Sequence, residues 1–220
     1  MVSEECIKSF IDSDAHPGAF REQSQAIPLV WKVGHRPRTG YAANVTEARY
    51  RPLVFLDVDG PLIPFAGPVG ESDDFGNPLV ARLDPGVRPL LEALPCELVW
   101  ATTWMHEANE VISPRLGLGA LGVVEWPEDA GDGIDEWFGL HWKTRTLVEW
   151  ARGRPFIWVD DEIGERDVEW VAENCGGRAL LYRVDARVGL RRCDFGVLGE
   201  WCAGVMAEGS GGGGFQPLRE

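Results

Sequence analysis

The sequence has few of the features that are typical of disulfide-bonded secreted proteins, zinc proteins or membrane-spanning proteins. Its five cysteines are odd in number and show no C-x-x-C or Cys/His spacing, so we expect neither a disulfide framework nor a zinc site. No apolar run is long enough to span a membrane, and the N-terminal stretch carries acids and a Pro-Gly pair where a signal peptide needs apolar residues. We therefore expect a cytoplasmic protein.

Basic residues are also few. Lysine and arginine number 21 against 35 acidic residues, a net charge of -14 that disfavours broad binding to duplex nucleic acid but leaves room for a local basic pocket. The glycine-rich phosphate-binding motifs G-x-G-x-x-G after a strand and G-x-x-x-x-G-K-[ST] do not occur, which argues against nucleotide-cofactor enzymes and P-loop kinases.

The chain is long enough to bury one full core. Its 220 residues are 45% hydrophobic, which favours a single domain with additions at its ends. We expect a catalytic domain over residues 51–207, with residues 1–50 forming an extension that packs on this core. Residues 208–220 are expected to be a flexible glycine-rich tail.

Short apolar runs alternate with amphipathic segments along the domain. This alternation predicts an α/β fold: a three-layer, Rossmann-like parallel sheet with helices on both faces. The expected strands are residues 53–56, 98–101, 122–126, 156–159 and 178–184. The expected helices are residues 85–94, 105–112, 141–152, 165–174 and 190–206, and Ser113 and Pro114 should stop the second of these.

Polar residues directly follow the apolar runs. In an open parallel sheet the ligand crevice lies beyond the carboxyl ends of the strands, so these residues are the candidate site. Asp57-Val58-Asp59-Gly60 follows the first run, Thr102-Thr103 the second, and Asp160-Asp161 the fourth. Lys143 stands near the start of the helix that precedes the fourth run.

This ordered set resembles the four motifs of the haloacid dehalogenase (HAD) superfamily over residues 53–184. Those motifs are a strand followed by D-x-D-G, a strand ending in Thr or Ser, a Lys, and a strand ending in paired acids. The segments between Asp59, Thr102 and Lys143 are short, which implies that no large cap domain is present. Within the superfamily, the L-V-W-A-T-T-W strand looks most like small bacterial enzymes linked by similarity to nucleic-acid end repair.

The resemblance implies a catalytic role for each residue. Asp57 is the nucleophile that forms an aspartyl-phosphate, and Asp59 is the general acid and then the general base. Thr102 hydrogen-bonds a phosphoryl oxygen, with Thr103 as the substitute if the strand ends one residue later. Lys143 keeps Asp57 ionised and balances charge in the transition state.

The resemblance also implies a Mg²⁺ ion, which favours oxygen ligands. Its expected ligands are the Asp57 carboxylate, the Asp59 backbone carbonyl, and Asp160 or Asp161. Of these two acids we expect Asp160 to matter more, because it directly ends the strand. Pro61 departs from the family pattern and removes one backbone N–H near the phosphate pocket.

Several other residues have simpler interpretations. Glu162 and Asp167 lie close enough in sequence to join the metal shell, but solvated helix positions are expected for both. The H-E-x-x-E sequence that begins at His106 lacks the second histidine of a zinc-protease helix, so a surface helix face is expected. Four of the ten tryptophans could border the site and stack a nucleobase, although core packing is the commoner fate of this residue: Trp104, Trp126, Trp137 and Trp142.

The sequence thus predicts a magnesium-dependent phosphatase acting on a phosphate monoester, either a small metabolite or a nucleic-acid end. A HAD-fold binding or regulatory module without turnover is the alternative, and the complete set of motif residues argues against it. Dehalogenation is disfavoured because Asp59 would have no leaving oxygen to protonate.

Overall fold

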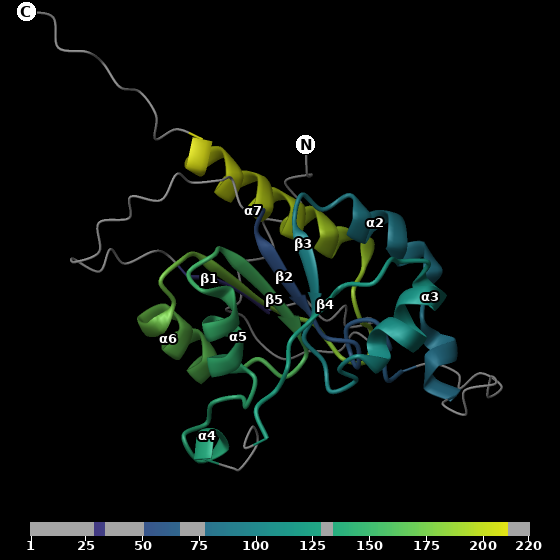
Figure 1. Cartoon of the computed structure of the whole chain (residues 1–220), viewed down its shortest axis with the longest axis horizontal. Coiled ribbons are helices and arrows are strands. Elements are labelled where there is room, and N and C mark those ends of the chain that lie inside the picture. The colour runs from purple at the N-terminus through teal and green to yellow at the C-terminus, as the bar shows by residue number, and fades with distance from the viewer. Residues whose placement is uncertain (1–28, 34–50, 67–77, 129–133, 211–220) are drawn as a thin grey trace, which may run out of the picture.

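A computed structural model describes residues 29–33, 51–66, 78–128 and 134–210 (Figure 1). The strands are β1 (Leu29–Val33), β2 (Leu53–Leu56), β3 (Glu97–Trp100), β4 (Gly122–Val123), β5 (Phe156–Asp160) and β6 (Ala179–Arg183). The α-helices are α2 (Arg88–Glu92), α3 (Ser113–Leu116), α4 (Ile134–Trp137), α5 (Thr144–Ala151), α6 (Glu165–Asn174) and α7 (Arg192–Ser210). Three shorter helical turns are η1 (Pro78–Arg82), η2 (Pro85–Val87) and the π-helix η3 (Ala108–Ile112).

The strands form one sheet in the order β1-β6-β5-β2-β3-β4. All neighbours are parallel except β1, which pairs antiparallel with β6 from Leu29 opposite Arg183 to Val33 opposite Ala179. The predicted α/β class is confirmed, and no large cap is seen over the described residues. The edge strand β1 was not predicted, because its pairing partner lies far along the chain.

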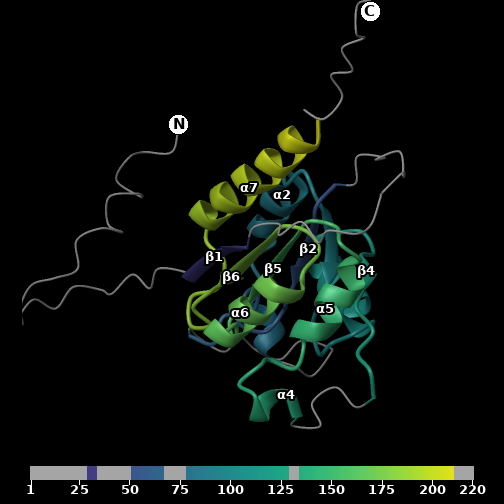
Figure 2. The same cartoon turned by 90° about the vertical axis from the view of Figure 1, so that its left-hand side faces the viewer.

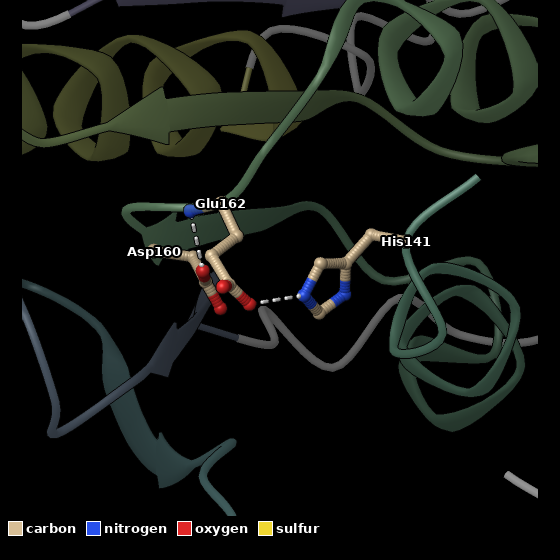
Figure 3. A group of neighbouring side chains, drawn as sticks. All are labelled: His141, Asp160 and Glu162. Atoms are coloured by element: carbon tan, nitrogen blue, oxygen red, sulfur yellow. Dashed lines mark hydrogen bonds and ion pairs between the residues drawn. The ribbon is translucent and has the colours of Figure 1, made fainter. Parts of the chain in front are cut away.

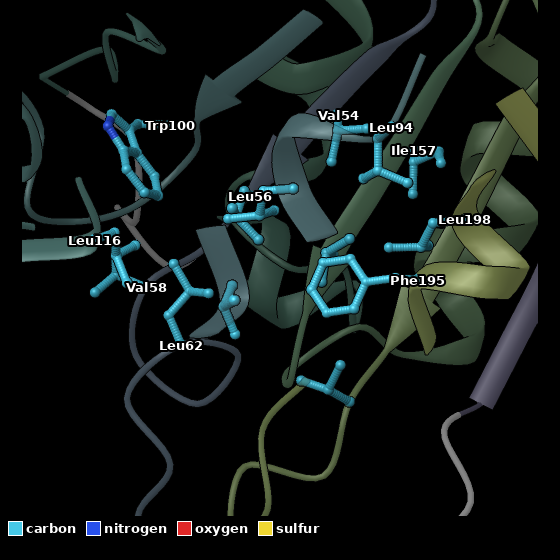
Figure 4. Close-up of a cluster of buried hydrophobic side chains, with 14 of the residues drawn as sticks. Val54, Leu56, Val58, Leu62, Leu94, Trp100, Leu116, Ile157, Phe195 and Leu198 are labelled. Atoms are coloured by element: carbon cyan, nitrogen blue, oxygen red, sulfur yellow. The ribbon is translucent and has the colours of Figure 1, made fainter. Parts of the chain in front are cut away.

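Alternate residues of the central strands point into two separate cores. One core lies between the sheet and helices α2, α3 and α7, and contains Val54, Leu56, Trp100, Ile157, Phe195 and Leu198 (Figure 4). The other lies under α5 and α6 and contains Leu53, Phe55, Phe156, Trp158, Leu147 and Val171. Figure 2 shows the sheet between these two helical layers. Burial on both faces explains why the central strands are continuous apolar runs.

Several expected boundaries differ from those observed. The helix expected to stop at Ser113 and Pro114 instead continues through α3 and ends at Gly117, whose φ is 72°. Proline lacks an N–H and clashes with the carbonyl four residues earlier. Here the turn before it is a π-helix, in which the Ser113 N–H donates to the Ala108 carbonyl. The wider turn gives the proline ring space.

Other elements are shifted in length. β4 has two residues rather than five, α5 begins at Thr144 rather than at residue 141, and α7 continues to Ser210. The sequence also predicts a glycine- and aspartate-rich turn at residues 129–135, of which residues 129–133 lie outside the described residues. Within the described ranges, no helix combines the length and apolar character needed to cross a membrane.

Candidate active site

The candidate residues meet where the connectivity of the sheet changes direction. From β2 the chain moves to β3 and β4 on one side, and then returns to β5 and β6 on the other. The carboxyl end of β2 is therefore flanked by the carboxyl ends of β3 and β5, which is where a parallel sheet opens a crevice. Asp57, Thr102 and Asp160 lie at these three strand ends.

A buried lysine joins two of the acids. The Lys143 Nζ donates to Oδ2 of Asp57 and to Oδ2 of Asp160, each at 2.8 Å. The Lys143 and Asp160 side chains are 3% and 0% exposed, so both ion pairs are shielded from solvent. Asp57 also accepts the Val58 N–H through Oδ1 at 2.7 Å.

The pKa values of Asp57, Asp160 and Lys143 are shifted in different directions. Burial, followed by the negative charge of Asp160, raises the pKa of Asp57 to about 7. Burial alone would also raise the pKa of Asp160, but Lys143 holds it below its ordinary value. The lysine pKa is raised: its two carboxylate partners outweigh the effect of burial. Lys143 and Asp160 are thus a fixed ion pair, and Asp57 is the group that still needs positive charge.

Asp160 and Asp161 have different surroundings. Asp160 accepts hydrogen bonds from Lys143, from the Trp158 indole at 3.2 Å and from the Glu162 N–H at 2.9 Å. Asp161 is partly exposed, and burial together with the charge of Asp160 raises its pKa to about 6.

Gly60 permits the close approach of Asp161 to the β2 loop. Its φ of +83° lies in the left-handed region, and a Cβ at this position would lie 2.6 Å from Cγ of Asp161. The glycine of the D-x-D-G motif therefore lets the loop turn and also makes room for the acid that directly follows β5.

Asp59 and Thr102 lie on adjacent segments. Val58 points into the core at 0% exposure, so Asp57 and Asp59 face the same side, as strand geometry predicts. Oδ2 of Asp59 accepts the indole N–H of Trp104 at 2.9 Å. Thr102 is buried and its Oγ1 accepts the Trp104 backbone N–H at 3.4 Å, whereas Thr103 is exposed. The burial of Thr102 favours it over Thr103 as the site residue.

Comparison with known families agrees with this geometry. A family model described as the HAD domain in Swiss Army Knife RNA repair proteins matches residues 53–195. The chain belongs to this family. The resemblance deduced from the four motifs is thus confirmed. No curated protein and no solved structure matches the chain.

Membership in this HAD family points to hydrolase activity of the phosphatase type, and HAD domains generally use Mg²⁺. The donor set fits such an ion: carboxylate oxygens of Asp57, Asp160 and Asp161 lie within 4.8 Å of one another. Mg²⁺ prefers carboxylate oxygen over nitrogen or sulfur ligands. The raised pKa of Asp57 also indicates that positive charge is needed beside it.

Pro61, where this HAD domain departs from the usual motif, has a structural role. It lacks an N–H, but its carbonyl accepts the Leu190 N–H at 2.9 Å. The Phe65 N–H likewise donates to the Ala186 carbonyl at 2.7 Å. The loop after Asp59 is thereby tied to the segment between β6 and α7.

Asp167 corrects a sequence interpretation. It was expected to be solvated, yet it is 1% exposed and accepts three hydrogen bonds. The donors are the His141 N–H at 2.8 Å, the Thr144 hydroxyl at 2.5 Å and the Gly164 N–H at 2.7 Å. These contacts fix the residues on both sides of Lys143 to the first turn of α6. A capping position at the start of α6, three residues after Gly164, was the available sequence signal.

His141 and Glu162 form a second link across the same edge. In Figure 3, His141 points from the loop before α5 toward Glu162, which follows Asp160. Nε2 of His141 lies 3.1 Å from Oε2 of Glu162, and Nδ1 accepts the Lys143 N–H at 3.1 Å. An Nδ1 that accepts carries no proton, so Nε2 is the donor to Glu162. Glu162 is exposed, as expected.

The four tryptophans singled out from the sequence have different environments. The Trp126 indole donates to the Thr102 carbonyl at 2.9 Å, and its ring meets that of Trp142 edge to face at 4.8 Å. Trp104 contacts Asp59, while Trp137 on α4 is 87% exposed. Both views show α4 standing out from the body of the domain (Figures 1 and 2).

Proposed function

We propose that this chain is a magnesium-dependent phosphatase that hydrolyses a phosphate monoester through an aspartyl-phosphate on Asp57. The observation that carries this proposal is the buried Asp57–Lys143–Asp160 group at the carboxyl edge of β2 and β5, with both Lys143 contacts at 2.8 Å. In this proposal residues 51–207 are the catalytic domain, and residues 1–50 are an extension that packs on it.

Each chemical step has a residue to perform it. A carboxylate oxygen of Asp57 forms a bond to phosphorus while the bond to the leaving oxygen breaks, and Asp59 gives that oxygen a proton. Asp59, now ionised, takes a proton from the water that attacks the aspartyl-phosphate, which releases inorganic phosphate and restores both carboxyl groups. Lys143 and Thr102 supply positive charge and a hydrogen bond to the phosphoryl oxygens.

We assign the metal to Asp57, the Asp59 backbone carbonyl and Asp161. When bound, Mg²⁺ supplies charge that offsets repulsion between the dianionic ester and the Asp57 carboxylate. Asp160 already accepts three hydrogen bonds and is fully buried, whereas Asp161 is partly exposed over Gly60. This contrast favours Asp161 as the direct ligand and Asp160 as the partner that orients Lys143, the reverse of the order expected from the sequence.

The substrate we favour is a phosphorylated nucleic-acid end. The family description supports it. A cavity of about 580 Å³ beside the site, lined by Asp161, Glu162, Asp185 and Arg183 among others, leaves space for a substrate but does not distinguish its class. A terminal phosphate needs only a few local contacts, so the net charge of -14 is compatible with this substrate. A small phosphorylated metabolite is the competing outcome of the test.

The test is a phosphatase screen of the full chain with Mg²⁺. The panel holds p-nitrophenyl phosphate, sugar phosphates, nucleoside monophosphates, and oligonucleotides phosphorylated at the 3′ or 5′ end. We expect hydrolysis that EDTA abolishes and that Asp57→Asn reduces to background, because the amide keeps the shape but cannot attack phosphorus. Acid-quenched wild-type protein should carry labelled phosphate, and Asp57→Asn should not.

Asp59→Asn should slow hydrolysis of unactivated esters by roughly 10²- to 10⁴-fold, the usual range for losing general acid-base catalysis. Activity that survives EDTA, or full activity of Asp57→Asn, would contradict the proposal. A folded chain that binds these ligands without hydrolysing any of them would favour the non-catalytic binding module.

A further inference from the structure

Trp104 forms a hydrogen bond with Asp59 that the proposed reaction does not yet explain. Its indole Nε1–H donates to Oδ2 of Asp59 at 2.9 Å, and both residues are partly buried. The two residues come from the loops after β3 and β2, so only the folded sheet brings them together. The rest of the Trp104 ring packs against the core below α2 and α3.

The backbone around Trp104 is held in an unusual shape. Met105 has a φ of 49°, a left-handed conformation that is unfavourable for a residue with a side chain. The Met105 N–H donates to the Thr102 carbonyl at 3.3 Å, and the Glu107 N–H donates to the Trp104 carbonyl at 2.9 Å. Strained backbone that persists near a candidate site is often tied to function. The turn fixes the backbone of Trp104, and its ring is held by the core and by Asp59.

The indole N–H can only donate, so Oδ2 of Asp59 accepts from it and cannot itself point a proton toward the ring. We propose that Trp104 is a positioning residue that reserves Oδ1 of Asp59 as the oxygen carrying the catalytic proton. This inference rests on the proposed function. It names the residue that decides which Asp59 oxygen faces the leaving group.

The role concerns one proton transfer in each half of the reaction. As the bond from phosphorus to the leaving oxygen breaks, its electron pair goes to that oxygen, which takes the proton from Oδ1 of Asp59. In the second half, Oδ1 takes a proton from the attacking water. Oδ2 remains bound to Trp104 throughout, so the carboxyl group does not rotate between the two steps.

Esters differ in how much they need that proton. An alkyl or nucleoside phosphate must leave as an alcohol, whereas p-nitrophenolate is stable enough to leave unprotonated. Loss of the Trp104 N–H should therefore slow the first half of the reaction selectively for the first class, whereas the second half is the same for every ester. A purely structural role for the ring would slow both classes by the same factor.

Trp104→Phe is the test variant, since phenylalanine keeps an aromatic ring in the core but has no N–H. Trp126→Phe is the matched control, because it removes an indole N–H from the same edge of the sheet, where the acceptor is the Thr102 carbonyl. With Mg²⁺, we expect Trp104→Phe to lower kcat/KM for a nucleoside monophosphate by about tenfold or more, the scale of one hydrogen bond; kcat/KM is compared because it reports the steps up to release of the leaving group. Its kcat/KM for p-nitrophenyl phosphate should stay within about twofold of wild type, which also shows that the variant is folded. Any loss in Trp126→Phe should be equal for both esters.

A double variant gives a second activity readout. In the Asp59→Asn background, adding Trp104→Phe should cause no further loss toward the nucleoside monophosphate, because both changes remove one function. Equal losses of kcat/KM toward both esters in Trp104→Phe, or additive losses in the double variant, would overturn the inference.

A measurement without turnover separates this inference from the proposed function. The indole N–H resonance of Trp104, assigned through Trp104→Phe, should shift in Asp59→Asn, while that of Trp126 should not. An unmoved Trp104 resonance would overturn the contact even if the enzyme is active. If the Trp104 resonance shifts in Asp59→Asn but the wild-type chain hydrolyses no ester, the proposed function is refuted, and the positioning role with it. The contact between Trp104 and Asp59 would still stand.

Discussion

Replacing Lys143 by Met tests the charge balance of the site. The side chain is 3% exposed and bridges Asp57 and Asp160 at 2.8 Å each, so its loss leaves two buried carboxylates without their cation. Removing one partner from a buried ion pair typically costs 3–5 kcal/mol, and the Asp57 side chain, at 10% exposed against 0% for Asp160, places our expectation near the lower end, about 3 kcal/mol. For a chain of this length that corresponds to a fall in Tm of roughly 6–12 °C.

The loss should depend on pH in a defined direction. Burial and the charge of Asp160 raise the pKa of Asp57 to about 7, so the protonated form is favoured in the folded protein. Its contribution to stability is complete below the ordinary pKa of 3.8 and is lost as pH rises through about 7. Lys143 opposes this loss of stability, because its positive charge and its hydrogen bond favour the ionised form of Asp57. The deficit of Lys143→Met should therefore be larger at about pH 8 than at about pH 5.5, where Asp57 can hold a proton.

The assay is urea unfolding of wild type and variant in EDTA at both pH values. Arg88→Met is the control: it removes an exposed ion pair with Glu92 at 2.9 Å, for which we expect no more than about 0.5 kcal/mol. A Lys143→Met deficit as small as that of the control, or one that is equal at both pH values, would refute the charge balance described here.

Three further results are expected. Magnesium should raise Tm more at about pH 8 than at about pH 5.5, because a ligand carboxylate must be ionised and the pKa values of Asp57 and Asp161 are raised to about 7 and about 6. Equal shifts of Tm at the two pH values would contradict this. Asp161→Asn should abolish most of that shift with little effect on the metal-free Tm, whereas Asp160→Asn should lower the metal-free Tm, so the opposite pattern would make Asp160 the ligand. Asp167→Ala leaves three donors without their acceptor, so it should lower the free energy of unfolding in urea by roughly 1–3 kcal/mol and also lower kcat. An unchanged unfolding midpoint would show that these contacts are dispensable.

The sheet was largely predictable because its central strands are buried on both faces. Leu53–Leu56 is an unbroken apolar run with Asp57 directly after it, and β2 has the expected bounds. The amphipathic segment Glu165–Asn174 likewise matches α6. Local pattern failed where tertiary pairing decides: β1 forms a strand because β6 offers an edge, and Pro114 is accommodated because the preceding turn widens.

The sequence by itself determined which chemical groups follow which strands, because a buried apolar run and the polar residues at its end are adjacent along the chain. That adjacency made Asp57, Asp59 and Thr102 candidates, and the position of Lys143 between the second and fourth runs completed the resemblance to the family. Only the tertiary structure decided how the two acids at the end of β5 divide their contacts, with Asp160 held by Lys143 and Asp161 lying over Gly60. Burial and hydrogen bonding between distant segments are properties of the folded chain, and no local pattern records them.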